Sequence, residues 1–148
     1  MRESIMQVRQ FTVADPAYTK SMELRERYLR APLGLSLDNE DLSVENTQLH
    51  FGLFEGDRLL GSVTFKIVNE SLLKLRQMVI DENAQGTGLG TMLINDAEEA
   101  VKELGYRDVE MAARVAVKGF YEKLGYVAQG DIFVEVKIQH IKMVKSDI

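Results

Sequence analysis

The sequence predicts an α/β (α+β) fold built on one mixed, mostly antiparallel β-sheet. Its first half consists mainly of short apolar runs separated by turns, a pattern typical of antiparallel strands. From Leu89 on, helical and strand patterns alternate instead, as they do in α/β proteins. No linker or low-complexity stretch interrupts the 148 residues, so we expect one domain over residues 1–148.

The first predicted elements are a strand and a helix. Residues 5–11 roughly alternate apolar and polar side chains, which indicates a strand. Asp15 suits the cap of a helix and Pro16 its first turn, and this helix is expected to continue to about residue 29. Residues 30–46 contain a proline, a glycine and an acidic cluster, which predict an irregular segment with room for a short helix.

Three further strands complete the first half. Apolar runs over residues 47–55 and 58–68 flank the Gly-Asp pair at 56–57. This pattern predicts a β-hairpin, because glycine tolerates the positive φ angle that a tight turn requires. Residues 71–81 predict the fourth strand of the sheet.

The second half opens with an amphipathic helix. Between Leu89 and Leu104 the apolar residues recur on one helical face, and Gly105 suits the end of that helix. The later predicted elements are a strand over 108–113, a helix over 116–124 ended by Gly125, and two strands over 126–144.

Composition and charge argue against several classes of protein. The net charge is −5 and charges of both signs are interspersed, which disfavours a nucleic-acid-binding surface. The absence of cysteine excludes disulfides, thiolate metal sites and a cysteine nucleophile. No apolar run approaches the roughly 20 residues of a membrane-spanning helix, and the N-terminus lacks the apolar core of a signal peptide. We therefore expect a cytoplasmic protein with no metal, nucleic-acid or membrane partner.

Residues 85–90, with the sequence QGTGLG, lie between the fourth strand and the next helix. The first turn of a helix leaves backbone N–H groups unpaired and carries partial positive charge, and glycines let an anion approach that backbone. The pattern fits a phosphate site, to which Gln85 can add an amide donor, and it fits a ligand-free turn equally well. The Walker and dinucleotide loops are excluded, because no lysine follows Gly90 and the spacing is G-x-G-x-G.

Residues 85–90 resemble the Q/R-x-x-G-x-G/A loop of the GNAT superfamily, the acyl-CoA-dependent N-acetyltransferases. Residues 119–133, GFYEKLGYVAQGDIF, resemble a later helix and strand of that family, and 133–145 resemble the C-terminus of a small single-domain branch. The resemblance covers about residues 50–148 and is weak over 1–49. It implies a central sheet of about six to seven strands with helices on both faces, splayed between the fourth and fifth strands.

The resemblance implies acetyl-CoA as the cosubstrate, with its pyrophosphate on the glycine loop. The pantetheine arm would lie between the splayed strands, and a backbone N–H of Met78 or Val79 would stabilise the oxyanion. The implied cosubstrate-binding residues are Met78, Val79, Ile80, Gln85, Gly86, Thr87, Gly88, Leu89, Gly90, Thr91 and Arg114.

Tyr121 is the candidate for the general acid. Acyl transfer needs a proton for the leaving thiolate, and a phenol with a pKa of about 10 stays protonated at neutral pH. Tyr121 matches the tyrosine that serves as general acid in many members of the superfamily. The alternative is a core aromatic residue packed at helical spacing with Val117 and Leu124.

Glu135 and His140 are the candidates for the general base. Some GNAT members carry a glutamate on the fourth strand, but Lys74 occupies that position here. An unperturbed histidine accepts a proton near neutral pH, while His140 can equally be a hydrogen-bonded strand residue. Glu135 can alternatively bind the cationic amine. His50 matches no motif, so we expect a structural or surface residue.

Two further departures from the superfamily pattern concern the site. Many relatives carry Asn-x-x-Ala where this chain has Arg114 and Val117, and the asparagine contacts the cosubstrate arm. Arg114 can reach a phosphate or the acceptor instead, or be solvated.

Arg25 and the acidic residues at 38–41 can face the acceptor, although solvated positions are expected for both.

These residues predict a transferase, an acetyl-CoA-dependent N-acetyltransferase (acyltransferase) that acts on a primary amine by direct attack. The acceptor is a small molecule or a peptide amine. The alternative is a catalytically weak or silent acyl-CoA-binding regulatory module, which the missing strand-four glutamate and the missing asparagine allow. Monomer and homodimer both stay open, since dimers are common in the superfamily.

Overall fold

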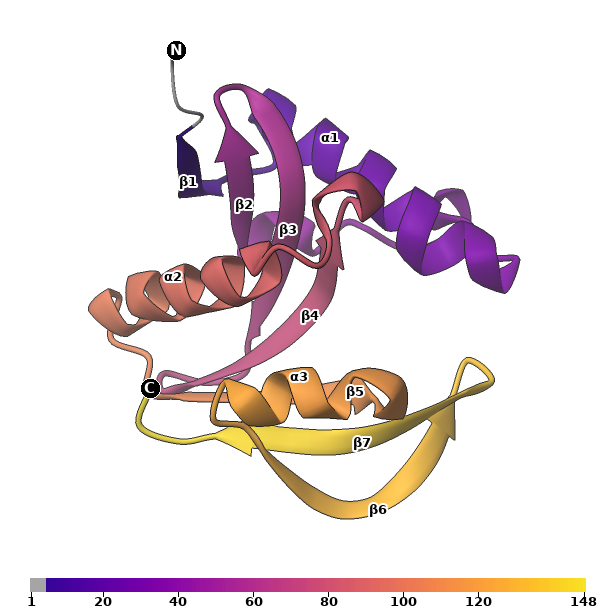
Figure 1. Ribbon diagram of the computed structural model, residues 1–148, viewed down its shortest axis with the longest axis vertical. Helices are drawn as coiled ribbons and strands as arrows, with labels where there is room; N and C mark the ends of the chain where they lie inside the picture. Colours follow the sequence, from indigo (N-terminus) through magenta and orange to yellow (C-terminus); the bar gives the residue numbers. More distant parts are fainter. Residues whose placement is uncertain (1–4) are drawn as a thin grey trace.

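The computed structural model describes residues 5–148 and contains one seven-stranded sheet in the order β1-β2-β3-β4-β5-β7-β6 (Figure 1). The strands are β1 (Met6–Phe11), β2 (Leu49–Glu55), β3 (Arg58–Ile67), β4 (Leu72–Ile80), β5 (Asp108–Arg114), β6 (Val127–Glu135) and β7 (Ile138–Lys145). The helices are α1 (Pro16–Arg25), α2 (Leu89–Glu103) and α3 (Lys118–Lys123), with a π-helix (Glu26–Arg30) and 3₁₀ turns at Ala31–Leu33, Leu37–Asn39, Glu45–Thr47, Glu82–Ala84 and Val115–Val117. The predicted order of elements and the mixed sheet are confirmed.

The sheet opens between its two parallel strands. β4 and β5 are parallel, and every other neighbouring pair in the described sheet is antiparallel. The ladder between them joins only Leu72–Lys74 to Asp108–Glu110. Beyond it, β4 continues to Ile80 and β5 to Arg114 without pairing to each other. The splay that the resemblance implied is thus present.

The helices cover both faces of the sheet, as expected. In Figure 1, α1 lies behind β2 and β3, whereas α2 and α3 lie in front of the sheet. Buried side chains of α2 and α3, such as Leu93 and Tyr121, share the main core cluster with the sheet. Leu24 of α1 belongs to a second cluster with Phe54 and Val79 on the opposite face. No helix among residues 5–148 is long and apolar enough to cross a membrane.

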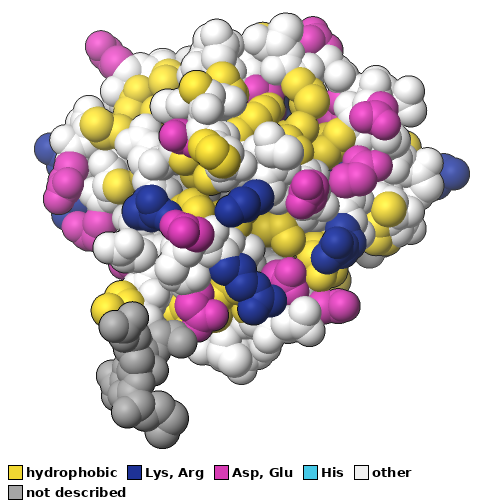
Figure 2. Space-filling view, turned by 90° about the horizontal axis from the view of Figure 1, so that it is seen from above, with side chains coloured by type: hydrophobic (Ala, Val, Ile, Leu, Met, Phe, Trp, Pro, Cys, Tyr) yellow, Lys and Arg dark blue, Asp and Glu magenta, His cyan; other side chains and the backbone are white. Residues whose placement is uncertain are grey.

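Acidic and basic side chains are interspersed on the face shown in Figure 2, with hydrophobic side chains between them. That face therefore has no continuous basic stripe of the kind that a nucleic-acid surface requires.

Two local details differ from the prediction. The first helix ends at Arg25, and Glu26–Arg30 continue it as a π-helix, a wider turn that is often found at functional sites. The turn between β6 and β7 contains Val136 and Lys137, with φ angles of 50° and 63°. A β-branched residue rarely adopts positive φ, so nothing in the sequence marks this turn.

A buried polar cluster joins α1 to the sheet. The side chain of Arg25 is 2% exposed and donates a hydrogen bond of 2.7 Å to Glu45, so the expected solvated position of Arg25 is wrong. Tyr18 donates to the same carboxylate at 3.2 Å. His50 is buried between the carbonyl of Glu45 and the hydroxyl of Thr64, at 2.8 and 3.0 Å, which confirms its structural role.

The Arg25–Glu45 pair predicts a large loss of stability in Glu45→Gln. Removing one partner leaves a buried guanidinium without a counter-charge, so the free energy of unfolding should fall by about 3–5 kcal/mol in urea denaturation. Glu110→Gln is the control, because Glu110 pairs with the exposed Lys142 at 3.6 Å and should cost less than about 1 kcal/mol. Equal losses in the two variants would contradict the assignment.

The same pair predicts a pH dependence. Burial acts to raise the pKa of Glu45, but hydrogen bonding and charge from Arg25 outweigh it and lower this pKa from 4.5. A carboxyl with a lowered pKa in the folded state stabilises the fold above its unfolded pKa, and this stabilisation is lost as the pH falls through the folded value. The wild type should therefore lose stability below pH 4.5 more steeply than Glu45→Gln does.

Candidate active site

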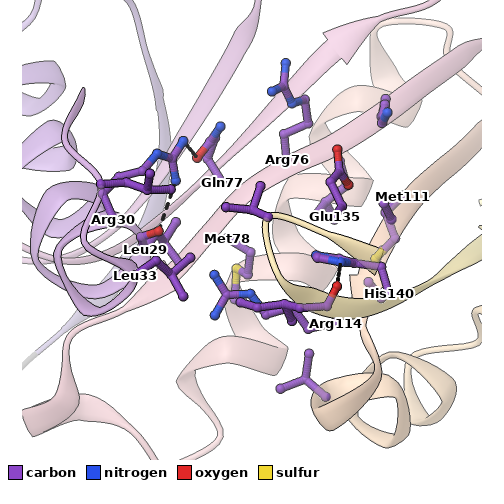
Figure 3. Close-up of a pocket in the computed structure, with 18 of the residues that line it drawn as sticks. Leu29, Arg30, Leu33, Arg76, Gln77, Met78, Met111, Arg114, Glu135 and His140 are labelled. Carbon is purple, nitrogen blue, oxygen red and sulfur yellow. Dashed lines mark hydrogen bonds between the residues drawn. The ribbon is translucent and has the colours of Figure 1, made fainter. Parts of the chain in front are cut away.

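The opening between β4 and β5 contains a cleft of about 560 Å³. Its walls come from both strands, from the segment around the π-helix and from the β6–β7 hairpin (Figure 3). The polar and charged residues that line it, together with Met78, are Arg30, Glu40, Lys74, Arg76, Gln77, Met78, Arg114, Tyr121, Glu135 and His140. All three catalytic candidates from the sequence, Tyr121, Glu135 and His140, thus line one cleft.

The glycine loop leaves a run of backbone donors free. In the described structure no hydrogen bond involves the N–H groups of residues 86–91, and the first turn of α2 has no side-chain cap. Gly86 and Gly88 have φ angles of 78° and 79°, which glycine adopts at little cost. A Cβ atom on Gly90 would lie 3.4 Å from the ring of Phe120, so a larger residue would crowd the helix start. This geometry offers an anion several convergent donors.

The side chain of Gln85, the expected amide donor to an anion, makes one hydrogen bond within the protein. Its side-chain amide donates to the carbonyl of Ile80 at 2.9 Å, so it ties the loop to the end of β4. The hydroxyl of Thr87 donates to the carbonyl of Ala84 at 2.7 Å. These two bonds hold the loop in shape, while the backbone N–H groups after Gln85 stay available.

A bulge in β4 shapes the wall of the cleft. Arg76 pairs with Thr64 and Val79 with Ser62, so β4 holds one extra residue between these pairs. Gln77, at the bulge, has a φ angle of 56°, which is uncommon for a residue other than glycine. The bulge lies where β4 has already left β5, so this edge of β4 has no strand partner in the described structure.

Met78, Val79 and Ile80 occupy that unpaired part of β4. The side chain of Met78 lines the cleft, and that of Val79 packs toward α1. The side chain of Val79 therefore does not reach the cleft, and the carbonyl of Ile80 is already bonded to Gln85. Arg114, at the end of β5, lines the cleft and pairs across the ladder with His140.

Tyr121 has an unpaired hydroxyl in the cleft. Its side chain is 6% exposed, and burial raises its pKa from 10.0 to about 12. The Tyr121 hydroxyl makes no hydrogen bond within residues 5–148. The one fully buried side-chain polar atom without a partner in those residues is Arg25 Nε, so the Tyr121 hydroxyl is accessible from the cleft. The neighbouring Tyr126, by contrast, donates to Glu98 at 2.7 Å. The core-packing and general-acid interpretations of Tyr121 are therefore compatible.

His140 presents one free ring nitrogen. Its Nδ1 lies 2.8 Å from the carbonyl of Ile138, and because a carbonyl only accepts, Nδ1 carries the proton. In the neutral ring, Nε2 is then the nitrogen with the lone pair. The ring stacks on Phe133 with centroids 5.8 Å apart, which fixes its orientation. Glu135 is exposed at the tip of the same hairpin and forms no ion pair in the described structure.

The structure adds three residues to the site that the sequence analysis did not name, Arg30, Arg76 and Gln77. Arg30, at the end of the π-helix, holds Glu40 through two hydrogen bonds and donates to Gln77 Oε1 at 2.9 Å. Lys74 and Arg76 alternate along β4 with buried leucines. From this period-two pattern, the sequence could have predicted that both side chains lie on the face of β4 opposite to the leucines. Arg30 and Gln77 carry no comparable signal. No cluster of metal-ligating side chains occurs within residues 5–148.

The mixed sheet splits beside a glycine-rich helix start, which is the arrangement that the resemblance to the GNAT superfamily implied. Residues 36–146 match the family model described as acetyltransferase (GNAT) domain. The chain belongs to this family and is an acyltransferase, since its members transfer an acyl group from an acyl-CoA to an amine.

Relatives and solved structures agree over almost the whole chain. The uncharacterized N-acetyltransferase YitI of Bacillus subtilis is 29% identical to this chain, in a match that covers 96% of this chain and 97% of the relative. An acyl-CoA N-acyltransferase structure from Pseudomonas aeruginosa has a TM-score of 0.80 at 20% identity, covering 96% of this chain and all of that one. A GNAT structure from Elizabethkingia anophelis, with acetyl-CoA bound, has a TM-score of 0.71 at 14% identity, covering 95% and 97%.

Gly88→Glu should abolish acetyl-CoA binding in calorimetry, because it places a carboxylate beside the N–H groups that would bind phosphate. An added Cβ at Gly88 would meet no atom within 4 Å, so positive φ is the main strain. Gly88→Ala shares that strain, of about 1–2 kcal/mol, without the charge and should keep most of the affinity. Similar affinities for the two variants would rule out this loop as the phosphate site.

Proposed function

We propose that this acyltransferase moves an acetyl group from acetyl-CoA to a primary amine by direct attack of the amine nitrogen. The observation that carries the proposal is the early separation of β4 from β5, which leaves a cleft with the unpaired Tyr121 hydroxyl on its wall. The unpaired edge of β4 suits an extended pantetheine arm, and the free N–H groups of residues 86–91 suit the pyrophosphate. The bound acetyl-CoA of the Elizabethkingia anophelis relative is consistent with this cosubstrate.

The cleft supplies each group that the chemistry requires. The amine nitrogen forms a bond to the thioester carbon, and the carbon–sulfur bond breaks. The nitrogen gives up a proton to His140 Nε2 or to Glu135, directly or through water, and Tyr121 protonates the leaving sulfur. A backbone N–H at Met78 or Val79 would stabilise the negative oxygen that develops. The products are an N-acetyl amine and coenzyme A with a free thiol.

A calorimetric titration with acetyl-CoA, followed by a thiol-release assay over a panel of amines, tests this function. Binding with release on at least one amine is the expected outcome. Binding without release across the panel would instead favour a silent acyl-CoA-binding module. This alternative arises because Lys74 occupies the position of the strand-four glutamate. Failure to bind acetyl-CoA would contradict both functions.

Tyr121→Phe should lower kcat by about 10²–10⁴-fold, the range typical of a lost general acid, and leave the Kd for acetyl-CoA nearly unchanged. Tyr126→Phe is the matched control, because it removes a neighbouring hydroxyl that is bonded to Glu98. This control should reduce stability rather than kcat. If Tyr121→Phe kept the wild-type rate, Tyr121 would be a packing residue only.

His140→Ala should remove the neutral limb of the pH–rate profile. A general base must be deprotonated to act, so the ionisation of the base should appear in the wild-type pH–rate profile. The variant should be slower, and its rate should no longer show that ionisation. Glu135→Gln separates the two candidates, since loss of an amine-binding carboxylate should raise KM for the acceptor and keep the neutral limb. An unchanged profile in His140→Ala would discard His140 as the base.

A further inference from the structure

We infer that the acceptor amine carries an anionic group, a carboxylate or a phosphate, that Arg76 and Lys74 of β4 bind. This inference rests on the proposed function and names the class of its acceptor. The inference is based on the side-chain charges that line the cleft, which are mainly positive, whereas the net charge of the chain is negative.

The cleft is basic in an acidic protein. The chain has a net charge of −5, yet its charged cleft-lining residues are Arg30, Lys74, Arg76 and Arg114 against Glu40 and Glu135. Arg30 and Glu40 neutralise each other through a two-bond ion pair. That hydrogen bonding from Arg30, together with the positive charges of Arg30, Arg25 and Arg76, lowers the pKa of Glu40. Three cations then face one free carboxylate, that of Glu135.

These three cations have no side-chain partner among residues 5–148. In the described structure Lys74, Arg76 and Arg114 form no ion pair and no side-chain hydrogen bond. By contrast, Lys142 on the same sheet pairs with Glu110 at 3.6 Å. A hollow lined by unpaired charges of one sign raises the local concentration of ligands of the other sign.

The pyrophosphate of acetyl-CoA does not account for Lys74 and Arg76. Their neighbours Leu73 and Leu75 are buried in the cluster that contains α2, so alternation along β4 directs Lys74 and Arg76 to the other face. Arg76 also pairs across the ladder with Thr64, whose hydroxyl bonds His50 beside α1. The free N–H groups at the start of α2 lie on the opposite side of the sheet.

The positions of the remaining polar groups indicate how the acceptor would be oriented in the cleft. Figure 3 shows Arg76 on β4 and both Glu135 and His140 on the other wall of the cavity. Glu135 and His140 suit the amine end, since one can attract a cation and the other can take its proton. An arginine fork suits a carboxylate or phosphate at the other end, through two parallel hydrogen bonds. An amine with a nearby anion fits both walls.

The test compares matched amines in the thiol-release assay with acetyl-CoA. The pairs are 4-aminobutyrate with 1,4-diaminobutane, L-leucine with L-leucinamide, and phosphoethanolamine with ethanolamine. In at least one pair, the anionic member should have a kcat/KM about tenfold or more above its partner, as expected for one charge-assisted contact. Equal or lower values for all anionic members, or no release with any of them, would overturn the inference.

Variants then locate the contact. Arg76→Gln and Lys74→Gln should each raise KM for the preferred anionic amine by about tenfold and leave the Kd for acetyl-CoA within about twofold. Arg107→Gln is the matched control, because Arg107 is exposed, precedes β5 and does not line the cleft. It should change neither value. An unchanged KM in both β4 variants would overturn the assignment.

Failure of the inference differs from failure of the proposed function. Suppose that acetyl-CoA binds and that cationic or neutral amines are acetylated with a kcat/KM equal to or above that of the anionic amines. The proposed transferase function is then retained, and the inference of an anionic acceptor is wrong. If acetyl-CoA does not bind, the proposed function fails, and the inference that depends on it fails as well.

Discussion

The separation of β4 from β5 after three paired residues is the constraint on which the rest of the site depends. A sheet that stayed closed would satisfy the backbone of both strands and leave no cleft. Here the edge of β4 beyond Lys74 gives up its strand partner, and the bulge at Gln77 turns the chain just past that point. Unpaired backbone groups beside a cavity are costly unless water or a ligand satisfies them. The fold therefore has a place for an extended ligand built into its sheet.

The polar groups around this opening divide between the two faces of the sheet. The free N–H groups at the start of α2 lie on the face that α2 and α3 cover, and Lys74 and Arg76 point to the face of α1. Tyr121 reaches the cleft from α3, and His140 reaches it from the C-terminal hairpin. On the α1 side, the buried Arg25–Glu45 pair joins α1 to the turn before β2, and the Arg30–Gln77 hydrogen bond joins the π-helix to β4. This arrangement separates the proposed cosubstrate and acceptor sites.

The sequence predicted the fold well because its signals are local. Period-two strands, the apolar face of α2 and the glycines after it each depend on nearby residues, and each is present as expected. The N-terminal segment is harder to predict from sequence. Arg25 has the pattern of an exposed helix cation, and its partner Glu45 lies twenty residues further along the chain. The positive φ angles of Gln77 and Val136 are set by strand pairing and turn geometry, for which neither residue type gives a signal. Long-range pairing, rather than weak local preference, thus limited the prediction of the site.

The most direct test of this account is a backbone-amide NMR titration of the protein with acetyl-CoA. The account predicts that the largest chemical-shift changes fall in two stretches, the loop amides of residues 86–91 and the unpaired part of β4 from Gln77 to Ile80. Amides of β1 and β2, far from the opening in the sheet, should change little. Saturable changes confined to other regions, or no changes at all, would contradict the claim that the split sheet and the glycine loop form the acyl-CoA site.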